Sequence, residues 1–276
     1  MNYRHGFHAG NFADVVKHLA LVRVLLHLRR KETPFAVIDS HAGPGLYDLA
    51  SDEARATGEA ETGIEKLRGL VDSKKAGGPE ALQTYLSLAA DPHAYPGSPL
   101  IAAKLLRPQD RLVAVEKHPE EAAALKKALA PFRKARALED DGYRRLASLL
   151  PPPERRGLIL MDPPFEAVDE FEHLAEAAKQ GLARFATGIF LIWYPIKSLA
   201  SARAFCGEVL AGAPASVSAL TIDTAIAAPE GKLDRAGLLL LNPPYGFEAE
   251  MKEMLALVAP RLPGGKTIME WLRAQA

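Results

Sequence analysis

Two short motifs in this sequence carry side chains suited to holding a flat ring that bears an amino group. Asp-Pro-Pro-Phe occupies 162–165 after the apolar run 157–161, and Asn-Pro-Pro-Tyr occupies 242–245 after the apolar run 237–241. In each motif a side-chain oxygen can accept a hydrogen bond from the amine, and the aromatic residue can stack on the ring. The prolines restrict the backbone and supply no competing N–H group.

The first motif suits methyl transfer to the exocyclic amine of adenine, a poor nucleophile because its lone pair is conjugated with the ring. The Asp162 carboxylate and the Pro163 carbonyl can accept the two N–H groups, which draws the nitrogen toward a tetrahedral geometry. Phe165 can stack on the base. Asp162, Pro163 and Phe165 are therefore candidate catalytic residues that act through positioning and electrostatics.

Alternating apolar and helical segments determine the expected fold. Seven strands are predicted, at 35–39, 111–116, 135–140, 157–162, 188–195, 216–223 and 237–242. Helical spacing is present at 11–31, 118–132, 167–183 and 197–211. Nearly continuous apolar strands that alternate with helices predict a mostly parallel sheet covered on both faces. The expected fold is α/β, and six parallel strands with an antiparallel seventh are the layout of the Rossmann-like class I methyltransferases.

The last two strands are expected to be antiparallel, because the loop 224–236 between them is too short for a helical crossover. The carboxyl end of the seventh strand would then lie at the opposite edge of the sheet from the cofactor. We therefore interpret the second motif as a structural turn and assign the chemistry to Asp162. A permuted enzyme that uses the second motif is disfavoured, since no Gly-rich loop within a strand–helix unit follows residue 245.

Residues 50–95 differ in composition from the segments around them. They are rich in Ala, Glu, Lys and Gly, with helical patterning near 58–71 and 79–90 and no convincing strand. We predict a helical insertion subdomain at 50–95, and a methyltransferase domain made of 1–49 and 96–276.

Polar residues follow the expected parallel strands at the edge where doubly wound sheets bind ligands. His41 and Gly43 follow the first strand, and Glu116 ends the second, where a carboxylate can take the two hydroxyls of a ribose. Asp141 and Gly142 follow the third strand, placed for an adenine edge. Dinucleotide and P-loop glycine patterns are absent from the sequence. S-adenosyl-L-methionine fits better, because it has a ribose and an adenine but no phosphate.

Composition narrows the remaining classes of function. The 34 Lys+Arg and 34 Asp+Glu cancel, which argues against indiscriminate binding of nucleic acid. A local basic rim could still form from Arg133, Lys134, Arg136 and the Arg pairs at 144–145 and 155–156. Cys206 is the only cysteine, which fits a reducing cytoplasm. No signal peptide or membrane-spanning run of about 18 apolar residues is expected.

The chain resembles, over essentially its whole length, the bacterial 23S ribosomal RNA adenine-N6 methyltransferases (the RlmJ family, formerly YhiR). The stretches that carry the resemblance include YRHGFHAGNFADVVKH (3–18), DSHAGPGLYDL (39–49), YPGSPLIA (95–102), VEKHP (115–119), DDGY (140–143), RRGLILMDPPFE (155–166) and LLLNPPY (239–245). The opening stretch is the most specific of them.

The resemblance implies roles that the residue pattern does not. Matching the motifs position by position places these residues in a cofactor pocket: His18, His41, Ser98, Glu116, Asp141, Gly142 and Asp162. It makes Tyr3 a gate that meets the target base. Phe165 stands where the family usually has Tyr, which preserves stacking but removes a hydroxyl contact. No metal is expected, because His5, His8 and His18 lack carboxylates at zinc-like spacing.

The implied partner is 23S ribosomal RNA, protein-free or partly assembled, with the adenine single-stranded or flipped out of a helix. The enzyme is expected to act as a cytoplasmic monomer. Two alternatives stay open: the same chemistry on DNA adenine or a protein glutamine, and a non-catalytic RNA-binding protein. The presence of both Asp162 and Glu116 argues against the second alternative.

Overall fold

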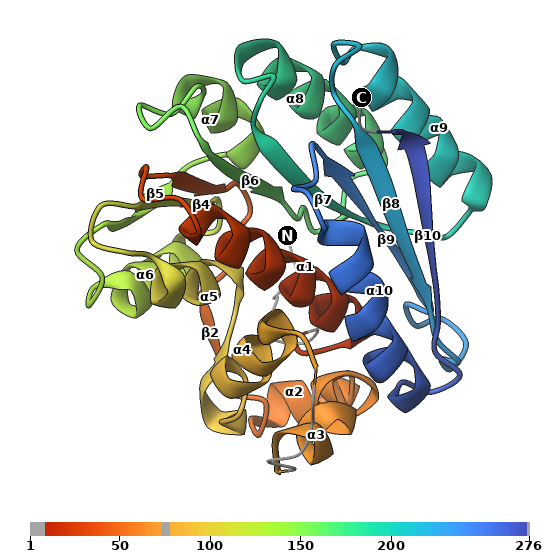
Figure 1. The fold of residues 1–276 in the computed structure, drawn as a ribbon. Helices are drawn as coiled ribbons and strands as arrows, with labels where there is room; N and C mark the ends of the chain where they lie inside the picture. Colours follow the sequence, from red (N-terminus) through yellow and green to blue (C-terminus); the bar gives the residue numbers. More distant parts are fainter. Residues whose placement is uncertain (1–8, 73–77, 275–276) are drawn as a thin grey trace.

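The computed structural model describes residues 9–72 and 78–274, which form helices around one eight-stranded sheet (Figure 1). The strand order is β10-β8-β9-β7-β6-β1-β4-β5. The strands are β1 (Ala36–Asp39), β4 (Arg111–Glu116), β5 (Ala135–Glu139), β6 (Gly157–Met161), β7 (Ile189–Pro195), β8 (Ala219–Ala225), β9 (Arg235–Leu241) and β10 (Lys266–Arg273). β1, β4, β5, β6 and β7 pair in parallel, and β9 is antiparallel to both β7 and β8. The expected Rossmann-like class and antiparallel seventh strand are confirmed.

The expected count of seven strands is wrong, because β10 adds an eighth at the edge of the sheet, antiparallel to β8. Along β10 exposed residues alternate with half-buried ones, and each face carries both charged and apolar side chains. Because neither face is uniformly apolar, the local sequence gives little indication of a strand, and β10 is defined by its pairing with β8. A separate two-stranded sheet of β2 (Leu46–Tyr47) and β3 (Tyr95–Pro96) was also not expected.

Helices cover both faces of the large sheet (Figure 1). One face carries α1 (Phe12–Arg29), α5 (Ser98–Leu105), α6 (Pro119–Leu129) and α10 (Phe247–Val258), and the other carries α7 (Gly142–Leu149), α8 (Glu170–Arg184) and α9 (Leu199–Ala211). In β6, Leu158 and Leu160 belong to the first core, whereas Ile159 and Met161 belong to the second. Burial on both faces explains why the strands are apolar at nearly every position.

Short helices between β2 and β3 pack against α1 (Figure 1). They are α2 (Asp52–Thr57), η2 (Ala60–Thr62), η3 (Ile64–Leu67), α3 (Arg68–Asp72), α4 (Glu80–Leu88) and η4 (Pro92–Ala94). Ile64, Leu82 and Leu86 share the core that surrounds α1. α1 is therefore buried on nearly all sides, and its charged residues Asp14 and Lys17 are buried with it. Buried charges require partners, which makes α1 a place to look for a site.

Candidate active site

A cavity of about 940 Å³ lies at the carboxyl ends of the parallel strands. In the sheet β1 lies between β6 and β4. The order of the strands along the chain therefore reverses at β1, and doubly wound sheets bind their ligands at such a reversal. Six of the residues expected in the site line the cavity: His41, Gly43, Glu116, Asp141, Gly142 and Asp162. Its volume is within the range of about 300–1,000 Å³ typical of small-molecule sites.

Glu116 holds the Gly-rich loop that follows β1. Its Oε2 accepts a hydrogen bond from the Gly43 N–H (2.8 Å), and its Oε1 accepts one from the His118 N–H (2.7 Å). Gly43 has a φ of 62°, a backbone conformation that favours glycine. Each carboxylate oxygen retains a second lone pair, so the oriented Glu116 side chain can still accept hydroxyl groups of a ligand.

The Asp-Gly pair after β5 brings α7 against the loop after β1. A Cβ on Gly142 would lie 1.9 Å from the Ser40 carbonyl oxygen, so only glycine fits. Asp141 caps α7 by accepting the Arg144 N–H (3.1 Å), and it pairs with the Lys117 ammonium (2.8 Å). Burial by itself raises the pKa of Asp141, but the Lys117 ammonium outweighs burial and lowers this pKa below its usual value. Asp141 therefore stays charged at the cavity edge.

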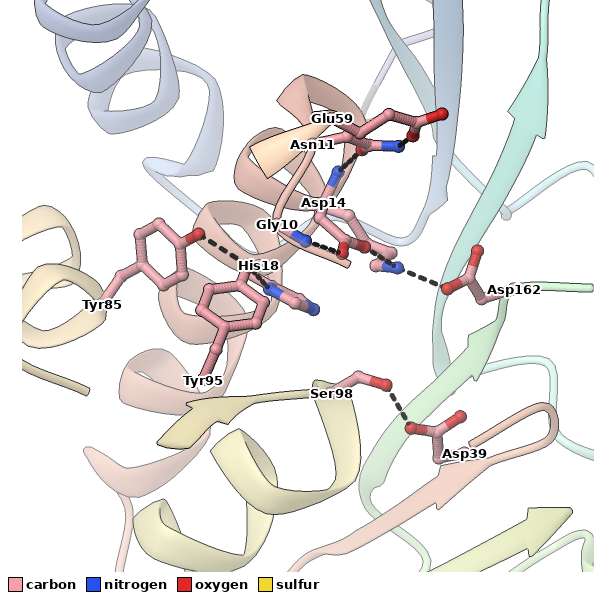
Figure 2. Close-up of polar contacts among 11 residues, drawn as sticks. Gly10, Asn11, Asp14, His18, Asp39, Glu59, Tyr85, Tyr95, Ser98 and Asp162 are labelled. Atoms are coloured by element: carbon pink, nitrogen blue, oxygen red, sulfur yellow. Dashed lines mark hydrogen bonds and ion pairs between the residues drawn. The ribbon is translucent and has the colours of Figure 1, made fainter. Parts of the chain in front are cut away.

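A smaller cavity of about 10 Å³ is lined by His18 and Ser98 as well as by His41 and Asp162. Because His41 and Asp162 line both cavities, the two spaces meet at these side chains. His18 is buried, and its Nδ1 lies 3.1 Å from the Tyr95 hydroxyl (Figure 2). Tyr3 lies outside the described residues, as do His5 and His8.

Asp162 is held by a buried lysine. Its Oδ2 accepts a hydrogen bond from the Lys17 ammonium, which also donates to Asp14 Oδ1 at 2.6 Å. Burial by itself lowers the pKa of Lys17, but the two carboxylates outweigh burial and raise this pKa above its usual value. The other oxygen of Asp162 has no hydrogen-bond partner among residues 9–72 and 78–274, so it can accept one from a ligand.

Asp39 is a second buried carboxylate at this edge, and we did not select it from the sequence. Its Oδ2 accepts a hydrogen bond from the Ser98 hydroxyl (2.7 Å), whereas its Oδ1 is buried without a partner in the described part of the chain (Figure 2). Burial raises the pKa of Asp39 to about 7. A positively charged ligand would compensate this carboxylate, so the residues present fit a cationic cofactor.

Comparison with known proteins identifies the family. The family model described as "Ribosomal RNA large subunit methyltransferase D, RlmJ" matches residues 32–273. The chain belongs to this family. Two relatives, each named "Ribosomal RNA large subunit methyltransferase J", come from Haemophilus influenzae and Escherichia coli K12. They are 35% identical over 285 residues (99% of each chain) and 34% identical over 270 residues (95% of this chain, 94% of the relative), respectively.

A solved structure agrees with this assignment. A crystal structure of a Legionella pneumophila protein matches 96% of this chain and 98% of its own, with 32% sequence identity and a TM-score of 0.86. The resemblance inferred from the sequence is thereby confirmed as membership of the RlmJ family.

In this RlmJ-family chain the Phe165 ring does not line the cavity. It packs edge-on against Phe171 (centroids 4.8 Å apart) and Trp193 (5.7 Å), and Phe165 has a φ of 52°. Pro164 and Asp162 line the cavity, while Pro163 between them is buried. Stacking of Phe165 on a base would therefore require its ring to leave the aromatic cluster.

The second motif lies at the opposite edge of the sheet, as strand direction predicted. Asn242 has a φ of 53°, and its side-chain amide donates to the carbonyls of Ala186 and Gly188 (both 2.8 Å), which precede β7. Tyr245 is 88% exposed. The motif thus lies away from the cavity, with Asn242 bound to backbone carbonyls, as the interpretation as a structural turn requires.

The basic rim expected from the sequence does not form as one surface. Arg144 and Arg145 lie at the cavity end of the sheet, where both pair with Asp140. Arg155 and Arg156 precede β6 and lie at the other end, where Arg156 donates to the carbonyls of Leu28 and Thr33. Residues that precede a parallel strand lie at the opposite edge of the sheet from residues that follow one. The expectation that these basic residues form one rim is therefore wrong.

Residues 9–72 and 78–274 contain neither a candidate metal site nor a candidate membrane span. No group of three or more His, Cys, Asp or Glu side chains in this part of the chain could hold a metal ion. Within the same residues, every helix is too short or too polar to cross a membrane.

Proposed function

We propose that this chain transfers a methyl group from S-adenosyl-L-methionine to the N6 amine of one adenine in 23S ribosomal RNA. The position of Asp162 carries the proposal: it directly follows the central parallel strand β6 and lines the cavity, with one oxygen held by Lys17 and the other without a hydrogen-bond partner in the described part of the chain. Two prolines follow it directly. The names of the two relatives support large-subunit ribosomal RNA as the substrate.

The lining of the large cavity favours a cationic cofactor over a phosphate. Nine acidic side chains line it: Glu116, Glu121, Glu139, Asp140, Asp141, Asp162, Glu166, Glu170 and Glu176. Lys117 and Arg144 are the lysine and arginine in the same lining. Bound S-adenosyl-L-methionine would supply a methyl group on a positively charged sulfur. RNA phosphates would be repelled, so a neutral base turned out of the strand is the part that enters.

We assign the cofactor contacts by position. Glu116 would take the ribose hydroxyls, and Asp141 with Gly142 the adenine edge. Asp39 and Ser98 would face the positively charged end of the cofactor. His18, His41 and Gly43 complete the set, on the grounds of family motif and of their places in the two cavities.

Asp162 would activate the target amine. Its available oxygen accepts one N6–H and the Pro163 carbonyl accepts the other, which directs the nitrogen lone pair at the methyl carbon. S-adenosyl-L-methionine, when bound, would supply the methyl group and keep the electron pair of the broken carbon–sulfur bond, and Asp162 would take the proton that the nitrogen loses. Phe165 would stack on the base after leaving Trp193, and Tyr3 is proposed as the gate from family motif alone.

Labelled cofactor tests this proposal. The protein is incubated with S-adenosyl-L-methionine labelled in the methyl group and, separately, with protein-free 23S rRNA, DNA and a protein extract. We expect label in 23S rRNA, recovered after digestion as N6-methyladenosine. Label in DNA or protein and none in rRNA would contradict the assignment of the substrate.

A pair of variants tests the role of Asp162. Asp162→Asn should lower the rate of transfer by about 10³-fold while RNA binding persists, because the amide keeps the shape but not the charge. Asp169→Asn is the control, since Asp169 is an exposed acid on the same loop that does not line the cavity. Equal activity in the two variants would remove Asp162 from the catalytic role.

A further inference from the structure

We propose that Asp14 is a positioning residue for methyl transfer: it shares the Lys17 ammonium with Asp162 and so leaves Asp162 able to accept the target amine. The inference rests on the proposed function of Asp162. It also gives the insertion (residues 50–95) a role in the site, because contacts from the insertion hold Asp14 in place.

One ammonium lies between two carboxylates. Lys17 is 3% exposed, Asp14 8% and Asp162 5%. Lys17 Nζ donates to Asp14 Oδ1 at 2.6 Å as well as to Asp162 Oδ2. Figure 2 labels the two carboxylates. In such a buried setting, charges interact far more strongly than in water. The three side chains together carry one net negative charge.

That net charge decides what Asp162 can do. If Lys17 had Asp162 as its sole partner, the pair would be neutral, and Asp162 would be a weaker acceptor for the N–H and later for the proton. Because Asp14 draws part of the ammonium charge to itself, Asp162 retains negative character while Lys17 still fixes its orientation.

Asp14 has little freedom to move. Its Oδ2 accepts the Gly10 N–H (2.8 Å), and its own N–H donates to Asn11 Oδ1 (2.9 Å), the cap of α1. The Asn11 amide in turn donates to Glu59 Oε2 (3.0 Å), a residue of the insertion (Figure 2).

The insertion also holds the backbone at this point. The Ile64 N–H donates to the Gly10 carbonyl (2.8 Å), and a Cβ on Gly63 would lie 2.1 Å from the same oxygen. Only glycine at 63 permits this approach. A continuous set of contacts thus runs from Glu59 and Ile64 through Asp14 and Lys17 to Asp162, which lines the large cavity.

Comparing Asp14→Asn with Glu250→Gln tests the inference in the full-length protein. The asparagine can still accept the Gly10 N–H but has no charge. Glu250→Gln is a matched control, because Glu250 pairs with Arg23, the other strongly buried cation of α1, away from the cavity. We expect Asp14→Asn to lower kcat by roughly 10-fold to 100-fold with KM for cofactor and RNA within about twofold of wild type. Glu250→Gln should leave kcat unchanged.

The rate at which the Lys17 ammonium protons exchange with solvent, measured by NMR at pH 7, gives a readout independent of activity. The acidic groups that face Lys17 are Asp14 on its own helix, Asp162 after β6 and Asp39 at the end of β1. Losing the Asp14 charge should weaken the hydrogen bonds of the Lys17 ammonium and speed this exchange, whereas Glu250→Gln should not change it.

The outcomes separate this inference from the proposed function. An inactive wild-type protein would overturn the proposed function. An active wild type with an unchanged kcat in Asp14→Asn, or a loss confined to KM, would overturn only the role of Asp14. An unchanged exchange rate of the Lys17 ammonium protons in Asp14→Asn would also overturn it.

Discussion

The Lys17 ammonium contacts the Asp162 carboxylate, although the two residues are 145 positions apart in the sequence. The contact exists because α1 packs across the sheet beside the end of β6. Both side chains are buried, so each depends on the other for charge compensation. The Lys17–Asp162 pair therefore contributes both to the stability of the fold and to the proposed chemistry of Asp162.

Replacing Lys17 should destabilise the protein as well as impair catalysis. Lys17→Met leaves the buried Asp14 and Asp162 carboxylates without a cation, and we expect the free energy of unfolding to fall by about 3–5 kcal/mol. Urea denaturation at pH 8 measures this. Adding Asp14→Asn to Lys17→Met should restore part of the loss, because one uncompensated charge is removed. A loss below about 1 kcal/mol would show that water or a rearrangement compensates both carboxylates.

Cofactor binding should weaken as pH falls through the range in which Asp39 titrates. The pKa of Asp39 is about 7, so the carboxylate is mostly charged at pH 8 and mostly neutral at pH 6. We expect the Kd for S-adenosyl-L-methionine to rise roughly tenfold between these two values, because a neutral side chain attracts a cation less. Calorimetric titration measures it, and Asp39→Asn should bind weakly with no such pH dependence. A pH-independent Kd in the wild type would place Asp39 away from the cofactor charge.

Asp39 should also lower stability at alkaline pH. Its pKa is raised from 3.8 to about 7 on folding, so the folded state binds the extra proton between these values, and stability falls as pH rises through that window. Asp39→Asn removes this penalty and can keep the hydrogen bond from Ser98. Without ligand, the variant should be more stable than wild type at pH 8, and the difference should vanish near pH 4. A less stable variant at pH 8 would contradict the raised pKa.

Asn242 should matter for stability and not for catalysis. Asn242→Ala removes two hydrogen bonds to the backbone before β7 and places alanine at a φ of 53°, so we expect a loss of about 1–3 kcal/mol. The kcat at a temperature where the variant is folded should equal that of wild type. A kcat loss comparable to that of Asp162→Asn would contradict the structural assignment of the second motif.

Gly142 should tolerate no side chain. Gly142→Ala would place a Cβ 1.9 Å from the Ser40 carbonyl oxygen and push α7 away from the loop after β1, so cofactor affinity should fall at least tenfold. Gly207→Ala is the control, because Gly207 lies within α9 and its Cβ would meet nothing within 4 Å. That variant should gain roughly 0.5–1 kcal/mol from helix propensity. Equal affinities in both variants would show that the contact between α7 and the loop is not required.

Residues that directly follow apolar strands were predictable as parts of one site. Glu116, Asp141 and Asp162 each end or follow a short apolar run, and the carboxyl ends of parallel strands meet at one edge. The direction of β9 was also predictable, because a short loop admits only an antiparallel return. These predictions require only the pattern of apolar residues and the lengths of the loops between the strands.

Other parts of the site were not predictable in this way. Asp14 and Lys17 lie on a helical stretch of sequence with no single polar face, and the segment 50–95 that packs against this helix is distant from Asp162 in sequence. Likewise, Phe165 follows Asp162 closely in sequence, yet its ring turns to Trp193, because neighbouring side chains decide where it packs.

The motifs of the sequence carried the resemblance to the family, and its pattern by itself determined the fold class and which of the two proline motifs lies at the cavity edge. The reason is that backbone direction and burial follow from apolar runs and loop lengths. Only the tertiary structure decided that β10 joins the sheet, that Asp39 Oδ1 is buried without a partner among residues 9–72 and 78–274, and that Lys17 connects Asp14 to Asp162. Each of these depends on contacts between distant segments, and such contacts exist only when the whole chain packs.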